Sequence, residues 1–236
     1  AIIRAMRPLA LAGAVMVLAV ASPVAAQHRA FQPAIAEVGE AWRAAKAAFE
    51  LADGLAVELV AAEPQLANPV AFHIGHDGRI YVVETHRLRA GVIDMRDHVA
   101  WIDEDLACTT VAQRVAGIRR HFGDELDDWR SASERIRCLI DDDGDGAIDR
   151  ATVFADGFDD LADGIASGVL ADGDEVWFTN IPKLWKLTDA DRDGVAEQRA
   201  AVHHGFGVHF SLIGHDLHGL RIGPDRRLYF SIGDRG

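Results

Sequence analysis

Residues 141–158 read DDDGDGAIDRATVFADGF, and residues 189–206, which start 48 positions later, read DADRDGVAEQRAAVHHGF. The two segments agree at six pairs of positions: Asp141/Asp189, Asp143/Asp191, Asp145/Asp193, Gly146/Gly194, Gly157/Gly205 and Phe158/Phe206. Six matches at one offset indicate an internal repeat, and a period of 40–50 residues is typical of β-propeller blades when each unit consists of short strands and turns. Two similar hairpins in another all-β fold are the alternative.

Strand-like runs rich in aromatic residues accompany the repeat. GDEVWFTN at 173–180 follows the first segment, PDRRLYFSIGD at 224–234 follows the second, and DGRIYVVET at 77–85 is a third copy. Tyr81 of the third copy lies 96 positions, or twice 48, before Trp177. The sequence therefore predicts an all-β fold, a partial β-propeller of which this chain holds three to four blades.

Residues 51–236 form the predicted partial propeller. Helical sequence patterns precede and follow its first predicted strands. Residues 27–50 are rich in Ala and Glu and predict a short helical lead. Leu55–Val60 and Arg79–Glu84 are β-type runs. Residues about 86–136 interrupt the repeat with a helical pattern, so we expect an insertion of one or two helices there.

The first 26 residues are typical of a secretory signal peptide. Arg4 and Arg7 form a basic region, Leu9 to Val20 is an apolar run, and the small residues before Gln27 suit signal peptidase. The apolar run is shorter than the ~20 residues of a membrane span, which disfavours a retained anchor. We expect an exported protein, periplasmic or associated with the cell envelope, with no membrane span in the mature chain. Both ends are typical of a fragment.

The composition disfavours nucleic acid as a partner. The chain has 37 acidic and 24 basic residues, a formal net charge of −13, whereas phosphate backbones are bound by Lys and Arg surfaces. An acidic chain suits the capture of cations, although a merely soluble surface has the same charge. The two cysteines, Cys108 and Cys138, belong to no CxxC or CxxCH motif, and the sequence leaves open whether they pair.

The acidic segments predict two calcium loops. Each has carboxylates at loop positions 1, 3, 5 and 9 and a glycine at position 6, an oxygen-rich ligand set that Ca²⁺ prefers. The predicted ligands are Asp141, Asp143, Asp145, Asp149, Asp189, Asp191, Asp193 and Glu197. Position 12, where an EF-hand has a bidentate Glu, holds Thr152 and Ala200 instead, and strands flank the loops. These are therefore EF-like loops in a β context, unless they are solvated turns that bind nothing.

Five histidines gather after the second loop: His203, His204, His209, His215 and His218. The His215-x-x-His218 spacing, near Asp216, makes zinc an alternative, but neither Cys nor HExxH accompanies it. A histidine also suits general base catalysis, because its unperturbed pKa of ~6.5 lies near neutral pH.

The segment from His215 to Asp234, HDLHGLRIGPDRRLYFSIGD, resembles the signature of the soluble glucose/sorbosone dehydrogenases, which are six-bladed quinoprotein propellers. The resemblance covers about twenty residues and departs at Arg226, where the signature has Gly. It implies that His215 is the catalytic base and that pyrroloquinoline quinone (PQQ) accepts hydride from a sugar or other alcohol.

A broader resemblance spans residues 50–236 and rests on AAEPQLANPVAF, DGRIYVVET, the first acidic segment and GFG at 205–207. These motifs resemble the N-terminal propeller of the putative membrane-bound dehydrogenase family of planctomycete-type haem-binding CxxCH proteins. The resemblance implies an exported oxidoreductase that passes electrons to a cytochrome c domain, with haem c, beyond this chain. The alternative is a non-catalytic, calcium-stabilised propeller that binds carbohydrate or a protein partner.

Overall fold

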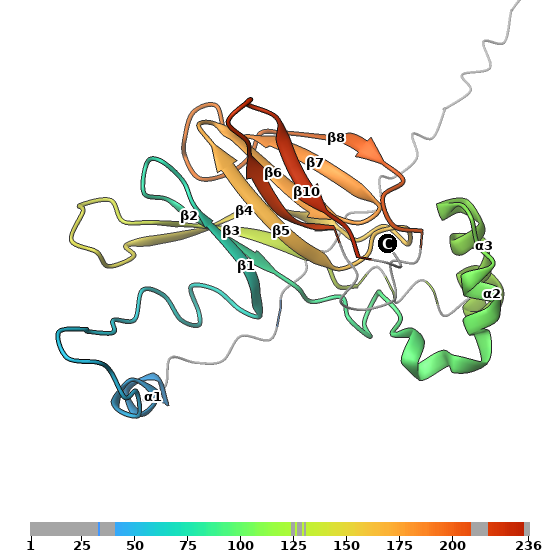
Figure 1. Ribbon diagram of the computed structural model, residues 1–236, viewed down its shortest axis with the longest axis horizontal. Coiled ribbons are helices and arrows are strands. Elements are labelled where there is room, and N and C mark those ends of the chain that lie inside the picture. Colours follow the sequence, from blue (N-terminus) through green and yellow to red (C-terminus); the bar gives the residue numbers. More distant parts are fainter. Residues whose placement is uncertain are drawn as a thin grey trace, which may run out of the picture. The chain divides into compact units, whose positions relative to one another are not determined.

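The computed structural model describes residues 33, 41–123, 126, 129, 131–208 and 217–233. The predicted signal peptide and most of the helical lead lie outside the described residues. Within them the protein is mostly β: three antiparallel sheets follow one another along the chain (Figure 1). The predicted all-β class is confirmed, and the sheets have a partial propeller-like arrangement.

The first two sheets have four strands each, and every strand pairs with the next in sequence. In the first sheet these are β1 (Pro69–Ile74), β2 (Ile80–Glu84), β3 (Glu134–Ile140) and β4 (Arg150–Phe158). In the second they are β5 (Ala166–Asp172), β6 (Glu175–Asn180), β7 (Lys183–Thr188) and β8 (Gln198–His204). The third sheet consists of the hairpin of β9 (His218–Ile222) and β10 (Leu228–Ser231).

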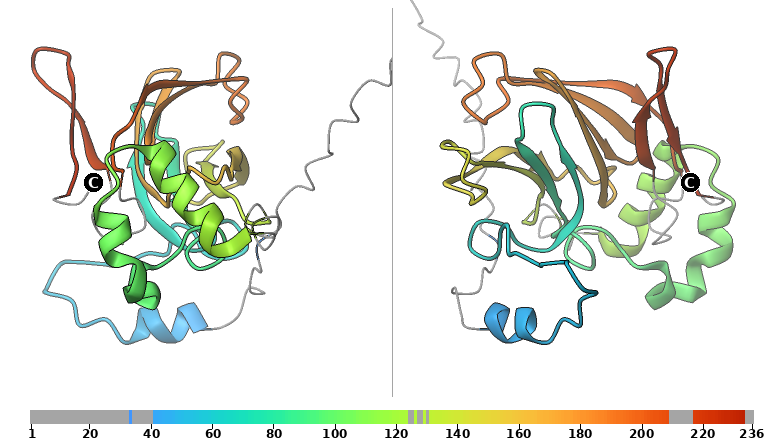
Figure 2. Two further views of the ribbon diagram at one scale, coloured as in Figure 1. Left: turned by 90° about the vertical axis from the view of Figure 1, so that its right-hand side faces the viewer. Right: turned by 60° about the vertical axis from the view of Figure 1, so that its left-hand side comes forward.

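The sheets are arranged as successive blades. The first strand of each sheet contacts the first strand of the next, so β1 lies against β5 and β5 against β9. Figure 2 shows the three sheets in chain order: the first runs from cyan to yellow, the second is orange and the third is red. Radial repetition of meandering four-stranded sheets with neighbouring first strands is the arrangement of a propeller.

Alternating side chains of the second sheet bury both of its faces. Val169 and Ala171 of β5 and Phe178 of β6 pack against the first sheet, in a core that also holds Phe154 and Tyr81. The rings of Tyr81 and Phe154 meet edge to face at 5.1 Å between centroids. On the opposite face, Leu170, Ile181 and Leu184 join the third sheet and the helical insertion in a second core. This alternation is expected of a strand that lies between two layers.

The helices match the predicted lead and insertion. Helix α1 (Ala41–Ala47) precedes the sheets, and the 3₁₀ helix η1 (Met95–Trp101), α2 (Ile102–Leu106) and α3 (Val111–Phe122) lie between β2 and β3. A capping box of Thr110 and Gln113 starts α3. Among the described residues, no helix combines the length and apolarity needed to span a membrane.

Two details of the sequence interpretation are wrong. Leu55–Val60 is not a strand but irregular chain, because no described strand pairs with its backbone; Leu55 is 67% exposed. The 96 positions between Tyr81 and Trp177 do not correspond to two repeats. These residues lie in β2 and β6, the second strands of adjacent sheets, and the insertion lengthens the first blade. Cys108 and Cys138, whose pairing was open, are both free thiols.

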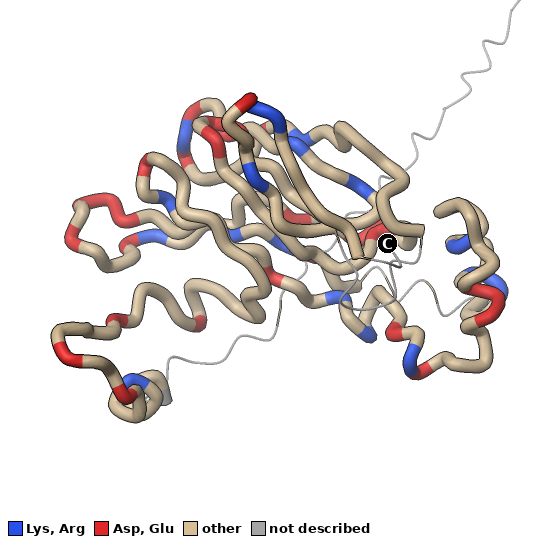
Figure 3. Tube along the Cα trace, in the orientation of Figure 1, with Lys and Arg blue, Asp and Glu red and all other residues tan. Residues whose placement is uncertain are grey.

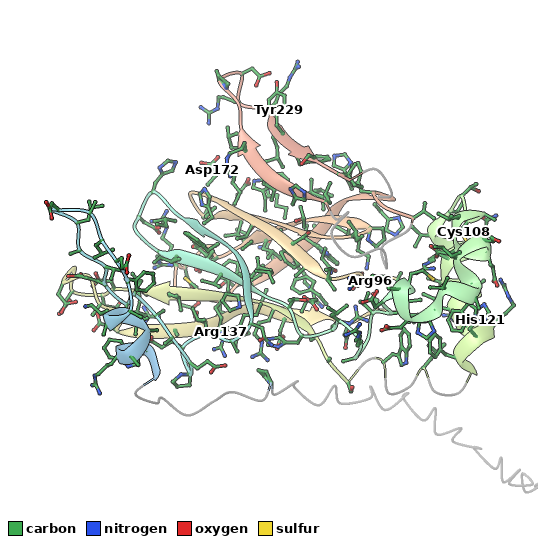
Figure 4. All side chains as sticks on the ribbon, turned by 60° about the horizontal axis from the view of Figure 1, so that its bottom comes forward. Arg96, Cys108, His121, Arg137, Asp172 and Tyr229 are labelled. Atoms are coloured by element: carbon green, nitrogen blue, oxygen red, sulfur yellow. The ribbon has the colours of Figure 1, made fainter. Side chains whose placement is uncertain are left out.

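The segments that join the strands lie at two opposite ends of the sheets. Strand direction alternates, so the turns 75–79, 141–149, 173–174, 189–197 and 223–227 share one end. The insertion, the connections between sheets and the short β6–β7 turn at 181–182 share the other end. Contacts across the sheets agree: Arg79 reaches Asp189 at the turn end, and Glu134 reaches Ala166 at the other. In Figure 4, Asp172 and Tyr229 lie far from Cys108 and His121 of the insertion.

Candidate metal centre

Both predicted calcium loops lie at the turn end, in equivalent hairpins of successive sheets. The first loop, residues 141–149, joins β3 to β4, and the second loop, residues 189–197, joins β7 to β8. Figure 3 shows acidic residues along both turns. The repeat found in the sequence is therefore one blade long.

The first loop folds around its own carboxylates. Asp141 accepts hydrogen bonds from the backbone N–H groups of Gly144 at 2.7 Å and Gly146 at 2.8 Å. Asp143 accepts from the N–H of Asp145, and Asp145 from that of Ala147. Asp149, at position 9, accepts from the N–H of position 2 at 2.8 Å. Gly146 has φ +91°, which explains why glycine stands at position 6.

The second loop repeats this pattern. Asp189 accepts from the N–H of Gly194 at 3.0 Å, which is again the bond from position 6 to position 1. Asp191 and Asp193 each accept from the N–H two residues later, at 3.2 and 2.8 Å. Glu197 accepts from the N–H of position 2 at 2.9 Å. Gly194 has φ +92°. The two loops therefore share a backbone conformation as well as a sequence pattern.

Potential metal ligands converge in each loop. Ligand oxygens within 4.8 Å of one another come from Asp141, Asp143 and Asp149 in the first loop, and from Asp189, Asp191, Asp193 and Glu197 in the second. The structure brings seven of the eight predicted ligands into these groups, and Asp145 stands outside the first. The donors are all carboxylate oxygens, which favour a hard cation such as Ca²⁺ over a softer metal.

Hydrogen bonding and burial shift the pKa values of the first carboxylates of the two loops in opposite directions. The N–H of Gly146, followed by further backbone N–H groups, lowers the pKa of Asp141. Burial raises the pKa of Asp189, which is 2% exposed. Like charges within a few ångströms repel, so a bound divalent cation would relieve the repulsion in both loops.

Several residues outside the loop motifs contact the second loop. Arg79, in the turn between β1 and β2, lies 3.3 Å from Asp189, and Arg150 of β4 donates to the carbonyl of Asp193 at 2.8 Å. Thr152 of β4 donates to the carbonyl of Gly194. These contacts were not predictable from the sequence, since nothing in the loop spacing says which turn of a neighbouring sheet lies beside the second loop.

The histidine site is only partly described. His215, the predicted base, and His209 lie outside the described residues. His203 and His204 are exposed at the end of β8, and His218 starts β9. None of these three belongs to a group of three or more potential metal ligands in the described part of the chain.

Comparison with known proteins identifies a family but not an activity. No curated protein matches the chain, and no solved structure matches it either. One family, described as a domain of unknown function (DUF7133), matches residues 42–236. That match covers the three sheets and both acidic loops, and the chain therefore belongs to the DUF7133 family.

Proposed function

We propose that this propeller segment binds calcium, with one Ca²⁺ in the first loop and one in the second. The observation that carries the proposal is the set of hydrogen bonds that the two loops share: position 6 donates to the carboxylate at position 1, and position 2 donates to the one at position 9. These bonds hold the carboxylates together despite their repulsion, which suits a cation at their centre.

The location of the loops supports a structural role for the ion. Both loops are turns between the third and fourth strands of their sheets, at the end away from the insertion. A bound ion would fix these hairpins without contacting the long connections at the other end. Calcium would therefore stabilise the blades and would not orient a cofactor there.

Calorimetric titration of the chelator-treated chain tests the proposal. We expect the intact chain to bind about two equivalents of Ca²⁺, and Asp143→Asn or Asp191→Asn to remove one each. Asp225→Asn is the matched control, because this carboxylate lies in the β9–β10 turn outside both groups. Full binding by the Asp143→Asn/Asp191→Asn double variant would overturn the proposal.

We further propose, as a second function, that the protein belongs to an exported quinoprotein-like dehydrogenase in which His215 takes the proton of a sugar or alcohol hydroxyl. Two observations support this. The resemblance at His215–Asp234 is one. The other is that the connection from β8 to β9, which contains His215, joins strands at the same end of the sheets as the insertion, and binding and catalytic residues commonly lie on loops.

One hollow among the described residues lacks the cationic partners that the quinone would need. PQQ would supply hydride acceptance and carries carboxylates that need cationic partners. A hollow of about 410 Å³ at this end is lined by Asn68–Val70, Thr85, His86 and Leu88, none of them Lys or Arg. We therefore propose that cationic residues outside this hollow would hold PQQ, and that haem c would lie in a domain beyond this chain.

Dye reduction separates this dehydrogenase from a non-catalytic propeller that binds carbohydrate or protein. The complete protein is supplied with calcium, PQQ and an artificial electron acceptor and is tested against a panel of sugars. If the protein is a dehydrogenase, we expect cofactor-dependent reduction of the acceptor. His215→Ala should abolish this reduction and leave calcium binding intact. Absence of reduction with every sugar would favour the binding protein instead.

A further inference from the structure

The two loops have different surroundings although their internal structure is the same. A Cβ added at Gly146 of the first loop would meet no atom within 4 Å. One added at Gly194 of the second loop would lie 2.9 Å from Thr152 Oγ1 and 3.0 Å from Ile140 Cδ1. The first loop therefore projects away from the sheets at this glycine, whereas the second packs against the first sheet.

Three consecutive carbonyls of the second loop accept hydrogen bonds from side chains of the first sheet. Arg79 donates to the carbonyl of Arg192 at 2.6 Å, Arg150 to that of Asp193 at 2.8 Å, and Thr152 to that of Gly194. In addition, the N–H of Ala196 donates to the carbonyl of Phe154 in β4 at 2.9 Å. The conformation of residues 192–196 is thus fixed from the neighbouring blade.

Thr152 is the most informative of these side chains, because its sequence position belongs to the first loop whereas its hydroxyl contacts the second loop. Counted from Asp141, Thr152 is position 12 of the first loop, where an EF-hand has its last ligand. Its hydroxyl instead contacts Gly194, whose N–H donates to the Asp189 carboxylate. Thr152 therefore fixes the residue that holds the first carboxylate of the second loop.

We propose that Thr152 is a positioning residue for metal binding by the second loop and not by the first. Before it can bind a cation, a loop must be held in one conformation, and the entropy lost in ordering it weakens affinity. The bond from Thr152 orders the second loop in advance, provided that the first two sheets are packed together. Metal binding by the second loop and packing of these sheets are then coupled, and each strengthens the other.

Thr152 allows a cleaner test than the arginines do. Removing Arg79 or Arg150 would take away a positive charge near the carboxylates, which by itself favours a cation and would oppose the loss of order. Thr152→Val keeps the shape and the charge and removes only the donor. This inference rests on the proposed calcium binding, so the test uses variants in which a single loop can bind.

The experiment measures Ca²⁺ affinity of the intact chain by calorimetry in two backgrounds. In the Asp143→Asn background only the second loop can bind Ca²⁺, and in the Asp191→Asn background only the first loop can. We expect Thr152→Val to weaken the second loop by about threefold to tenfold, as the loss of one hydrogen bond implies, and to leave the first loop unchanged. Thr152→Ser retains the hydroxyl and should restore the second loop's affinity.

Each alternative result has a distinct meaning. Equal weakening of both loops, weakening of the first alone, or no effect on the second would overturn the role of Thr152. Absence of Ca²⁺ binding in both backgrounds before Thr152 is changed would overturn the proposed function instead. Thr152→Ala, which also lacks the hydroxyl and is smaller, must give the pattern of Thr152→Val. His73→Phe is the control, because His73 accepts a hydrogen bond from the Ala171 N–H across the same two sheets without contacting either loop.

Discussion

Removal of calcium from the intact chain is expected to lower the midpoint of thermal unfolding by about 10–20 °C. A ligand present at one hundred times its dissociation constant stabilises the folded state by about 2.7 kcal/mol per site. Two occupied loops would contribute about 5 kcal/mol, and each kcal/mol shifts the midpoint of a domain this large by about 2–4 °C. Scanning calorimetry in calcium and in excess chelator measures the difference.

The loop variants provide the control for this experiment. Asp143→Asn and Asp191→Asn each remove one carboxylate from a converging group, so each should lose about half of the calcium-dependent shift. The double variant should unfold at the same temperature with and without calcium. A full shift in the double variant would assign the stabilisation to ions bound elsewhere and would contradict the role of the loops.

Substitution of Glu134 should be the most damaging single change in the described core. Glu134 starts β3 and is fully buried. Its carboxylate accepts hydrogen bonds from the backbone N–H groups of His86 at 3.1 Å, Arg87 at 2.8 Å and Ala166 at 3.0 Å. It therefore connects the chain that leaves β2 to the start of β5. Glu134→Ala leaves three N–H groups, two of them buried, without this acceptor, at an expected cost of about 3–5 kcal/mol.

Urea unfolding of the calcium-loaded chain measures this loss. Glu134→Gln retains one acceptor oxygen and should cost less than Glu134→Ala, because part of the hydrogen bonding survives. Glu175→Ala is the matched control: Glu175 forms a partly exposed ion pair with Lys186, and such pairs contribute up to about 1 kcal/mol. A Glu134→Ala variant as stable as Glu175→Ala would show that water replaces the carboxylate at low cost.

The sequence was most informative where structure is local. The hydrogen bonds of each acidic loop join residues two to seven positions apart, so the alternation of Asp and Gly in 141–149 specifies the turn by itself. The repeat of 48 positions is the spacing between the equivalent acidic turns of the first two sheets. Seven of eight predicted ligands converge for this reason. The capping box of α3 is another local signal.

Features that depend on a neighbouring sheet were not predictable from the sequence. Nothing near Thr152 indicates that its hydroxyl bonds to Gly194, 42 residues away, because that contact exists only once two sheets pack. Leu55–Val60 has the composition of a strand, yet a strand also requires a partner for its backbone. The 96 positions from Tyr81 to Trp177 resembled two repeats only because the insertion is about as long as one repeat.

The place of the insertion has a consequence for the order of folding. In the second sheet, β5 to β8 are joined by short turns, so each hairpin can close over few residues. In the first sheet, β2 meets β3 only after residues 85–133 have been looped out, and closing so long a loop costs about 2–3 kcal/mol more in entropy than closing a tight turn. Among the contacts within each sheet, those between residues far apart in the sequence are therefore concentrated in the first blade. We expect the second blade to fold first. The first blade, although synthesised earlier, should then complete its sheet against the folded second blade.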